Sequence, residues 1–228
     1  MRLIFIPGFG ETQRIFDQIA PHLPGEKLFI NNLDLLGTTH FSAITAIQYA
    51  QMLIKQHQIT REDCLIGHSM GGWIAYAAKH LTGCRVVQIA SWIDPKKVIL
   101  PLKKPEYIYW LVRNGWLFNR FNKQLILRLR YRNKPSAQIF GEVFQNLINS
   151  SPEYLVNQLE IILNPLESTI DTQPEMSIHS KKDLIVGFPD HPVITVSGDH
   201  FNLITYPQEV ITAINAFLKP TPNNLYGK

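Results

Sequence analysis

Short apolar runs alternate with amphipathic stretches along most of the chain. Continuous apolar runs are typical of strands buried on both faces, and their alternation with helical patterns indicates β-α-β units and a mostly parallel sheet. The predicted strands cover residues 3–6, 28–30, 64–66, 86–90, 176–179 and 193–196. The fold class is therefore α/β, with about six strands.

The stretches between these strands carry apolar residues at helical spacing. We expect helices over residues 13–23, 43–57, 71–81 and 207–218. Ser42 is a predicted N-cap for the second of them, and Pro207 stands at the start of the last, where proline is well tolerated. The segment that contains Asp34 and Gly37 is expected to be a loop.

Residues 95–172 contain no run typical of a parallel strand, but aromatic and aliphatic residues recur there at helical spacing. We interpret this stretch as a helical cap inserted into the sheet. The expected organisation is a core made of residues 1–94 and 173–220, the cap, and a short tail over 221–228.

The chain has 228 residues, 45% of them hydrophobic, which suits one globular domain. Its first apolar run is too short for a signal peptide or a membrane span, so we expect no transmembrane segment and a cytoplasmic location. Cys64 and Cys84 fit no metal-binding spacing. Buried free thiols are the simpler interpretation, and a single bridge stays open as the alternative.

Positive charge is concentrated in residues 95–135, where eleven Lys and Arg face one acid, Glu106, although the whole chain carries only +4. A solvated basic face is the ordinary explanation. The alternative is docking of an acidic carrier protein or an anionic membrane surface. No nucleic acid partner is expected, because nothing else in the chain resembles a recognition module.

The segment that carries chemistry is Gly67-His68-Ser69-Met70-Gly71, a G-x-S-x-G pattern between a predicted strand and a predicted helix. A nucleophile elbow needs this context, because the serine must stand on a sharp turn that exposes its hydroxyl. We predict Ser69 to be a nucleophile; a glycine-rich turn without chemistry is the alternative.

An acid and a histidine follow the serine in the chain order that this geometry requires. Asp183 lies four residues beyond the strand that ends at 179, and His200 lies four residues beyond the strand that ends at 196. Asp94 is the rival acid. Among the other histidines, His179 and His191 are the nearest rivals of His200, but their positions along the strands suit the site less well.

Neutral histidine can accept the serine proton during attack, and an acid on its other nitrogen fixes the tautomer. The backbone N–H groups of Phe9 and Met70 are the predicted oxyanion donors, because the first strand ends in the glycine-rich turn Pro7-Gly8-Phe9-Gly10. No metal or cofactor is required. Aromatic residues in and beside the insertion are candidates for an acyl pocket or for cap packing: Trp92, Tyr107, Tyr109, Trp110, Trp116, Phe118 and Phe121.

These segments together resemble the α/β-hydrolase superfamily, most of all the small capped serine esterases of the pimeloyl methyl ester carboxylesterase type. The matching segments are 7–10 for the oxyanion turn, 34–37 for the Asp-x-x-Gly loop, 67–72 for the elbow, 180–183 for the acid turn and 198–201 for the histidine loop. The resemblance implies the strand order 4-3-5-6-7-8 in the family's naming.

Two residues depart from the family pattern, since Pro7 replaces a usual histidine and Ser180 a usual glycine. Only residues 180–192 join the last two strands, so the usual helix there should be reduced or lost. The predicted activity is hydrolysis of a small or medium acyl ester through an acyl-serine. Alternatives are thioester cleavage on a carrier, carbon–carbon bond hydrolysis, and a non-catalytic receptor or scaffold role for the fold.

Overall fold

The computed structural model describes residues 1–37, 41, 43–100, 102, 104–164 and 172–219. These residues form a six-stranded, all-parallel sheet in the order β2-β1-β3-β4-β5-β6, which confirms the predicted fold class and strand order. The strands are β1 Arg2–Ile6, β2 Glu26–Phe29, β3 Cys64–His68, β4 Arg85–Ile89, β5 Met176–His179 and β6 Ile194–Thr195. The predicted tail, 221–228, lies outside the described residues.

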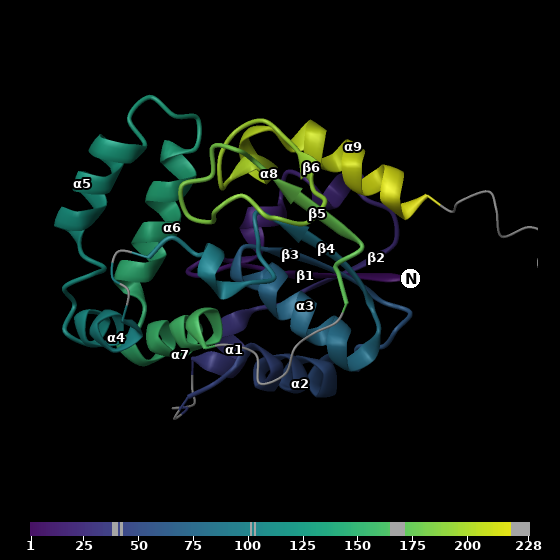
Figure 1. Ribbon diagram of the computed structural model, residues 1–228, viewed down its shortest axis with the longest axis horizontal. Helices are drawn as coiled ribbons and strands as arrows, with labels where there is room; N and C mark the ends of the chain where they lie inside the picture. Colours follow the sequence, from purple (N-terminus) through teal and green to yellow (C-terminus); the bar gives the residue numbers. More distant parts are fainter. Residues whose placement is uncertain (38–40, 42, 101, 103, 165–171, 220–228) are drawn as a thin grey trace, which may run out of the picture.

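Strand β1 illustrates why the sheet lies in the middle of the molecule. Leu3 and Phe5 point into one hydrophobic cluster, whereas Ile4 and Ile6 point into the other. Side chains alternate between the two faces of a strand, so a run that is apolar throughout needs helices on both sides. The sheet is accordingly sandwiched between two helical layers (Figure 1).

Helices α2 and α3 pack on one face of the sheet, and α8 and α9 on the other (Figure 1). The helices outside the insertion are α1 Asn32–Leu36, α2 Ala46–His57, α3 Met70–Thr82, α8 Asn202–Thr205 and α9 Pro207–Leu218. Short 3-10 turns add η1 Gln13–Phe16, η2 Ala20–His22 and η3 Pro95–Lys97. The predictions for 71–81 and 207–218 are thus confirmed.

Three local predictions were wrong in detail. The expected helix over 13–23 is two 3-10 turns, since Pro21 lacks the N–H that a continuous helix needs. The expected loop at Asp34 is the short helix α1. Helix α2 begins at Ala46, because Thr45 and Gln48 form a reciprocal capping box; Ser42, the predicted cap, lies outside the described residues.

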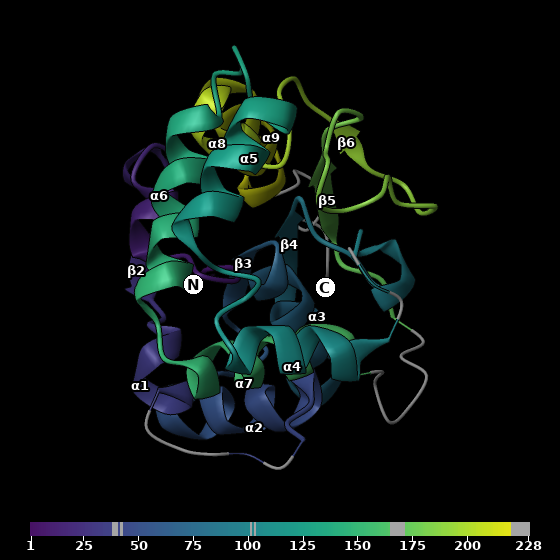
Figure 2. The same ribbon diagram turned by 90° about the vertical axis from the view of Figure 1, so that its left-hand side faces the viewer.

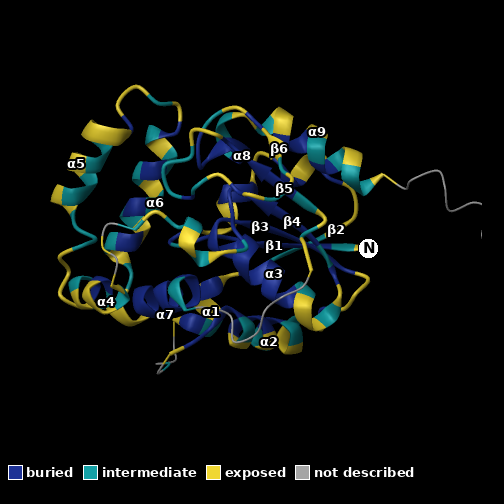
Figure 3. Cartoon of the chain, in the orientation of Figure 1, coloured by how far each residue is buried: buried dark blue, intermediate teal, exposed yellow. Residues whose placement is uncertain are grey.

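The insertion between β4 and β5 is helical, with α4 Pro105–Arg113, α5 Arg120–Arg130, α6 Ala137–Asn149 and α7 Pro152–Leu163. Helix α7 is buried over most of its length, whereas α5 has no buried residue and is drawn in teal and yellow in Figure 3. Figures 1 and 2 place α4 and α5 at the end of the molecule opposite the N-terminus. None of the described helices is both long enough and apolar enough to cross a bilayer.

The two cysteines are free and buried, as the simpler interpretation predicted. Burial raises the pKa of the Cys64 thiol to about 12 and also raises that of Cys84. Because the thiolate is the reactive form, both thiols are structural.

Candidate active site

Ser69 stands between β3 and α3 in a backbone conformation that side-chain-bearing residues rarely adopt, with φ 52° and ψ −122°. Two hydrogen bonds to the neighbouring strand hold it there. Its N–H donates to the Ile89 carbonyl at 2.9 Å, and the Ser91 hydroxyl donates to the Ser69 carbonyl at 2.7 Å. Such strain persists only where the surroundings fix it, and it accumulates at functional sites.

The glycines of the motif are required by close backbone approach. A Cβ on Gly67 would lie 2.3 Å from the Gly71 backbone, and one on Gly71 would lie 1.9 Å from the Ile6 carbonyl oxygen. Both positions exclude any side chain. The sharp strand-to-helix turn therefore depends on these two residues.

In the turn after β1, two backbone amides are hydrogen-bonded and the amide between them is not. Gly8 N–H donates to the Glu11 carboxylate at 2.6 Å, and Gly10 N–H donates to Gln158 Oε1 at 3.4 Å. The Phe9 N–H between them has no hydrogen-bond partner among the described residues, and the same holds for Met70 N–H. Gly8 approaches the Ser69 side chain closely, so the turn after β1 lies beside the serine turn. The unengaged amides of Phe9 and Met70, one in each turn, therefore lie near Ser69.

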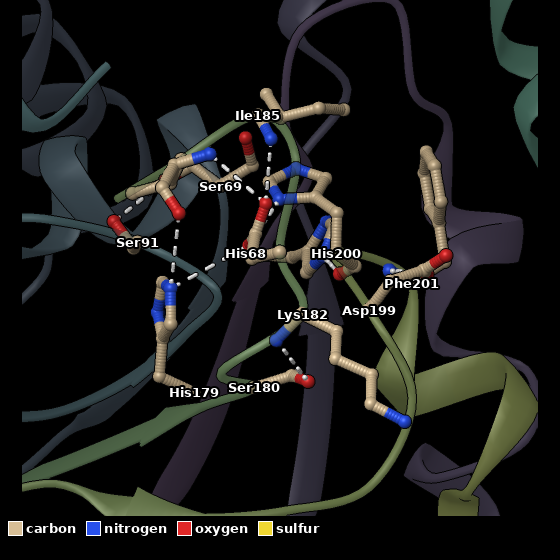
Figure 4. Close-up of polar contacts among 12 residues, drawn as sticks. His68, Ser69, Ser91, His179, Ser180, Lys182, Ile185, Asp199, His200 and Phe201 are labelled. Carbon is tan, nitrogen blue, oxygen red and sulfur yellow. Dashed lines mark hydrogen bonds and ion pairs between the residues drawn. The ribbon is translucent and has the colours of Figure 1, made fainter. Parts of the chain in front are cut away.

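Asp183 and His200 are hydrogen-bonded partners. His200 Nδ1 lies 2.8 Å from Asp183 Oδ2, and both side chains are almost fully buried. Figure 4 labels His200 together with Ser69, His68 and His179 among the polar contacts of the site. The other oxygen, Oδ1, accepts from the Ile185 and Val186 amides at 2.8 and 2.9 Å. His179 Nε2 approaches Oδ2 at 3.6 Å. The carboxylate is therefore fixed, with His200 as its nearest side-chain partner.

The charges of this pair reinforce each other. Burial by itself lowers the pKa of His200, but the charge and hydrogen bond of Asp183 outweigh burial and raise it above the usual value. Burial opposes ionisation of Asp183, yet His200 and the Val186 amide hold the pKa of this carboxyl below its usual range. Burial dominates at His179, whose pKa is lowered. The arrangement thus favours an ionised Asp183 that stabilises the protonated form of His200.

The histidine loop is fastened to the residue next to the candidate nucleophile. His68 Nε2 donates to the His200 carbonyl at 2.9 Å, and the two rings lie 4.9 Å apart. No hydrogen bond joins the Ser69 hydroxyl to His200 in the part of the chain that the structure describes, and His200 Nε2 likewise makes none there. Nε2 is therefore the ring nitrogen left to accept a proton, and catalytic hydrogen bonds often shorten only with substrate bound.

His68 is itself held by Glu11. Its Nδ1 lies 2.8 and 2.9 Å from the two carboxylate oxygens, and both side chains are buried. Glu11, His68 and His200 bring potential metal-ligand atoms within 4.8 Å of one another. Each of these groups already has hydrogen-bond partners, however, so a metal ion would have to displace the contacts that fix the two loops.

An apolar cavity of about 420 Å³ opens beside Ser69. Its size falls within the range of about 300–1,000 Å³ that is typical of small-molecule sites. Apart from Ser69 and Asn122, its lining is apolar: Phe9, Trp92, Val98, Ile99, Leu100, Ile108, Leu117, Phe118, Leu125, Ile126, Phe144, Leu159, Ile162 and Ile185. All four insertion helices contribute to this lining.

The structure places the seven candidate pocket aromatics in different environments. Trp92 and Phe118 line the cavity, whereas Tyr107, Trp110 and Trp116 do not and are 58, 55 and 66% exposed. Tyr109 and Phe121 do not line it either. Helix α4 turns Ile108 inward, which leaves Tyr107 and Trp110 on its outer side. The apolar pattern of α4 did not reveal which side faces the cavity, because aromatic residues occur on both.

The rival site residues lie elsewhere. Asp94 is exposed and caps η3 by accepting from the Lys96 amide at 2.9 Å. His191 Nε2 contacts the Ser177 hydroxyl at 2.9 Å. Asp199 accepts from the Phe201 amide at 3.2 Å and from the Ser136 hydroxyl, so it caps its own loop and ties it to the start of α6.

Sequence reasoning missed three supporting residues. Glu11 and His68 form the buried pair: His68 is a variable position of the elbow motif, and Glu11 directly follows the oxyanion turn. Ser180, noted only as a departure from glycine, donates its hydroxyl to the Gly198 carbonyl and so links the acid turn to the histidine loop. Of the three, only His68 carried an available signal, as a polar residue in an otherwise apolar strand.

A strained serine at a strand-to-helix turn, with an acid and a histidine on later loops of a parallel sheet, defines the α/β-hydrolase class of fold and site. The chain belongs to the Alpha/beta hydrolase family, whose pattern it matches over residues 3–213. A search of curated proteins gave no significant match.

Solved structures share the fold at low sequence identity. A hydrolase from Oleispira antarctica superposes with a TM-score of 0.71 at 15% identity, covering 96% of this chain and 91% of its own. A hydrolase from Pseudomonas aeruginosa PA01 gives 0.68 at 14% identity, with 96 and 90% coverage. A bromoperoxidase from Bacillus anthracis gives 0.65 at 16% identity, with 96 and 92% coverage. At this identity the similarity is one of fold.

Proposed function

We propose that this protein is a serine hydrolase that cleaves small or medium acyl esters through an acyl-serine intermediate, with Ser69, His200 and Asp183 as catalytic residues. The observation that carries the proposal is the 2.8 Å contact between His200 Nδ1 and Asp183 Oδ2, in a loop that His68 ties to the residue beside Ser69. This contact leaves Nε2 as the base.

In the proposed reaction, the Ser69 hydroxyl attacks the ester carbonyl carbon while His200 Nε2 takes its proton. Asp183 keeps the ring in the required tautomer and stabilises the imidazolium that forms. His200 then returns the proton to the departing alkoxide, and the acyl group stays on Ser69. A water molecule, deprotonated by the same nitrogen, releases the acid in the second half of the cycle.

The Phe9 and Met70 amides are the proposed oxyanion donors. Their lack of partners among the described residues supports this role, because a donor that is already engaged could not bind the developing charge. Each such donor contributes about 3 kcal/mol to the transition state in related chemistry. The contacts of Gly8 with Glu11 and of Gly10 with Gln158 fix the turn before substrate arrives.

We take residues 95–172 to be a cap over the core formed by 1–94 and 173–220. The lining contributed by Ile108, Ile126, Phe144 and Leu159, one from each insertion helix, supports this division. The cap then supplies the walls of the acyl pocket, while the core supplies the reacting groups.

The lining also favours one class of acyl group. An uncharged alkyl or aryl chain would bury its surface against apolar side chains, whereas a chain ending in a carboxylate would find, among the described lining residues, Asn122 alone as a polar partner beyond Ser69. We therefore favour monocarboxylic esters over dicarboxylic half-esters such as pimeloyl methyl ester, although the cap-and-core plan is similar to that esterase type.

A fluorophosphonate probe tests the mechanism directly, because it labels only an activated serine. Wild-type protein should be labelled, and Ser69→Ala and His200→Ala should not. Ser150→Ala and His22→Ala are matched controls on the surface and should label like wild type. No labelling of folded wild-type protein would support the receptor or scaffold alternative. If the protein is labelled, its turnover of matched esters and thioesters separates the ester and thioester hypotheses.

A further inference from the structure

The exposed face of α4 and α5 combines two features that rarely coexist on a solvated surface. On α5, Phe121, Leu125 and Leu129 are 75, 43 and 71% exposed and stand four residues apart, so they form one apolar stripe. Trp110 and Trp116 extend the apolar surface at α4, with ring centroids 6.1 Å apart. We name these five side chains the apolar stripe.

Cations that form no ion pair with a described residue lie on the same two helices as most of the apolar stripe. Helix α5 carries Arg120, Lys123, Arg128 and Arg130, and α4 ends in Arg113. None of these five forms an ion pair with a residue that the structure describes. A polar face rich in Lys and Arg beside a stripe of aromatic residues and leucine is the pattern of a helix that lies in a membrane interface.

We propose that this face docks on an anionic lipid bilayer, with the apolar stripe inserted among the headgroups and the cations of α4 and α5 against the lipid phosphates. A second copy of the chain is a poorer occupant, because it would bring the same cations to the contact. An acidic protein would satisfy the charge but would leave unexplained why large aromatic side chains, which favour the bilayer interface, protrude so far.

The position of the stripe relative to the cavity adds to the argument. Leu125 belongs to the stripe and also lines the cavity beside Ser69. Ile99, which is 50% exposed, likewise lines it. Leu125 therefore connects the outer side of α5 with the cavity, so a docked protein would bring this wall of the cavity to the lipid surface. Delivery of an ester by this route rests on the proposed function, but docking itself does not.

The test is sedimentation with vesicles, without any turnover. Wild-type protein should sediment with phosphatidylcholine vesicles that contain phosphatidylglycerol and not with pure phosphatidylcholine, and added salt should release it. Each basic residue near the surface contributes about fivefold to partitioning, so R128Q/R130Q should bind about 25-fold more weakly. F121S/L129S, which keeps every charge, should lose about tenfold or more. K55Q and L81Q, an exposed cation on α2 and an exposed leucine on α3, are matched controls and should bind like wild type.

All four of these variants lie outside the cavity, so unchanged hydrolysis of a short water-soluble ester, or an unchanged urea-unfolding midpoint, verifies their fold. Binding that the α5 variants leave intact, or that does not depend on phosphatidylglycerol, would overturn the proposal. Salt-dependent binding of wild-type protein to an acidic carrier protein but not to vesicles would identify a protein partner instead. A dimer in solution that the same variants dissociate would identify a second copy.

Discussion

His68 Nδ1 lies 2.8 Å from Glu11 Oε1, in a buried contact that joins the turn after β1 to the serine turn after β3. The same carboxylate accepts the Gly8 N–H, and the other nitrogen of His68 donates to the His200 carbonyl. Each ring nitrogen of His68 is therefore held by a different partner. One pair of side chains thus connects the two turns with the histidine loop.

The first prediction concerns this pair. Glu11→Gln keeps the shape but removes the negative charge and replaces one acceptor oxygen by an NH2 donor, so His68 and the Gly8 amide can no longer both be satisfied. We expect the free energy of unfolding to fall by about 3 kcal/mol, the typical loss when one partner of a buried pair is removed. Urea unfolding at neutral pH measures it. Glu142→Gln is the matched control, because Glu142 is exposed and accepts a hydrogen bond from Gln138, and should change stability by no more than about 0.5 kcal/mol.

A double-mutant cycle with His68→Gln then isolates the interaction. If the two residues act as a unit, the double variant will lose clearly less than the sum of the single losses, with a coupling of about 1–3 kcal/mol. Additive losses would show that Glu11 and His68 stabilise the fold independently.

The second prediction follows from the backbone of Ser69. A residue with a Cβ at φ 52° and ψ −122° is strained, and glycine relieves that strain. Ser69→Gly should therefore unfold with a free energy about 1 kcal/mol above that of Ser69→Ala, even though glycine loses more entropy on folding. Thermal or urea unfolding of the two variants makes the comparison. Equal stability would mean that the turn relaxes when the hydroxyl is removed.

Most of the sheet was predictable because burial on both faces leaves a direct trace in the sequence. The runs at 3–6 and 64–66 are apolar at every position and short, which is typical of a strand buried on both faces. Helix α9 was equally clear, since Pro207 marks its first residue. The start of α2 was not clear from the sequence, because both Ser42 and Thr45 could serve as N-cap. The reciprocal hydrogen bonds between Thr45 and Gln48 place the start at Ala46.

The chain order of the candidate site residues could be predicted from the sequence, but the side chains that hold their loops in place could not. Ser69, Asp183 and His200 are recognisable because each follows shortly after the end of a predicted strand. Glu11 and His68 have no such periodic signal, since their pairing joins residues 57 positions apart in the chain. The outward placement of Tyr107 and Trp110 was unpredictable for a similar reason: it depends on which face of α4 meets α7, a tertiary choice.

The third prediction concerns pH. His200 accepts a proton only when neutral, and its pKa lies above the usual value of about 6.5, so the acidic limb of the kcat/KM profile should have its midpoint above that pH. Asp183→Asn removes the negative charge that raises the pKa of His200 against the lowering effect of burial. The pKa of His200 should then fall, moving the midpoint to lower pH, while kcat drops about 10⁴-fold because the tautomer is no longer fixed.

Proton NMR of the His200 ring provides a readout that does not depend on turnover. The titration of this ring should move to lower pH in Asp183→Asn and stay in place in Asp94→Asn, the exposed rival acid. A shift in the second variant and not in the first would reassign the acid to Asp94.

The last prediction concerns the cavity beside Ser69. Each buried methylene group contributes about 0.8 kcal/mol, so kcat/KM for p-nitrophenyl esters should rise about fourfold per carbon until the cavity is filled. Val98→Phe adds volume to the lining, and longer chains should then meet an overpacking penalty of about 1–3 kcal/mol that short chains escape. The optimum should therefore move to shorter esters, with acetate turnover unchanged. Val143→Phe adds the same volume on α6 outside this cavity and should leave the chain-length profile as in wild type. A uniform decrease across all chain lengths in Val98→Phe would instead place the acyl chain elsewhere.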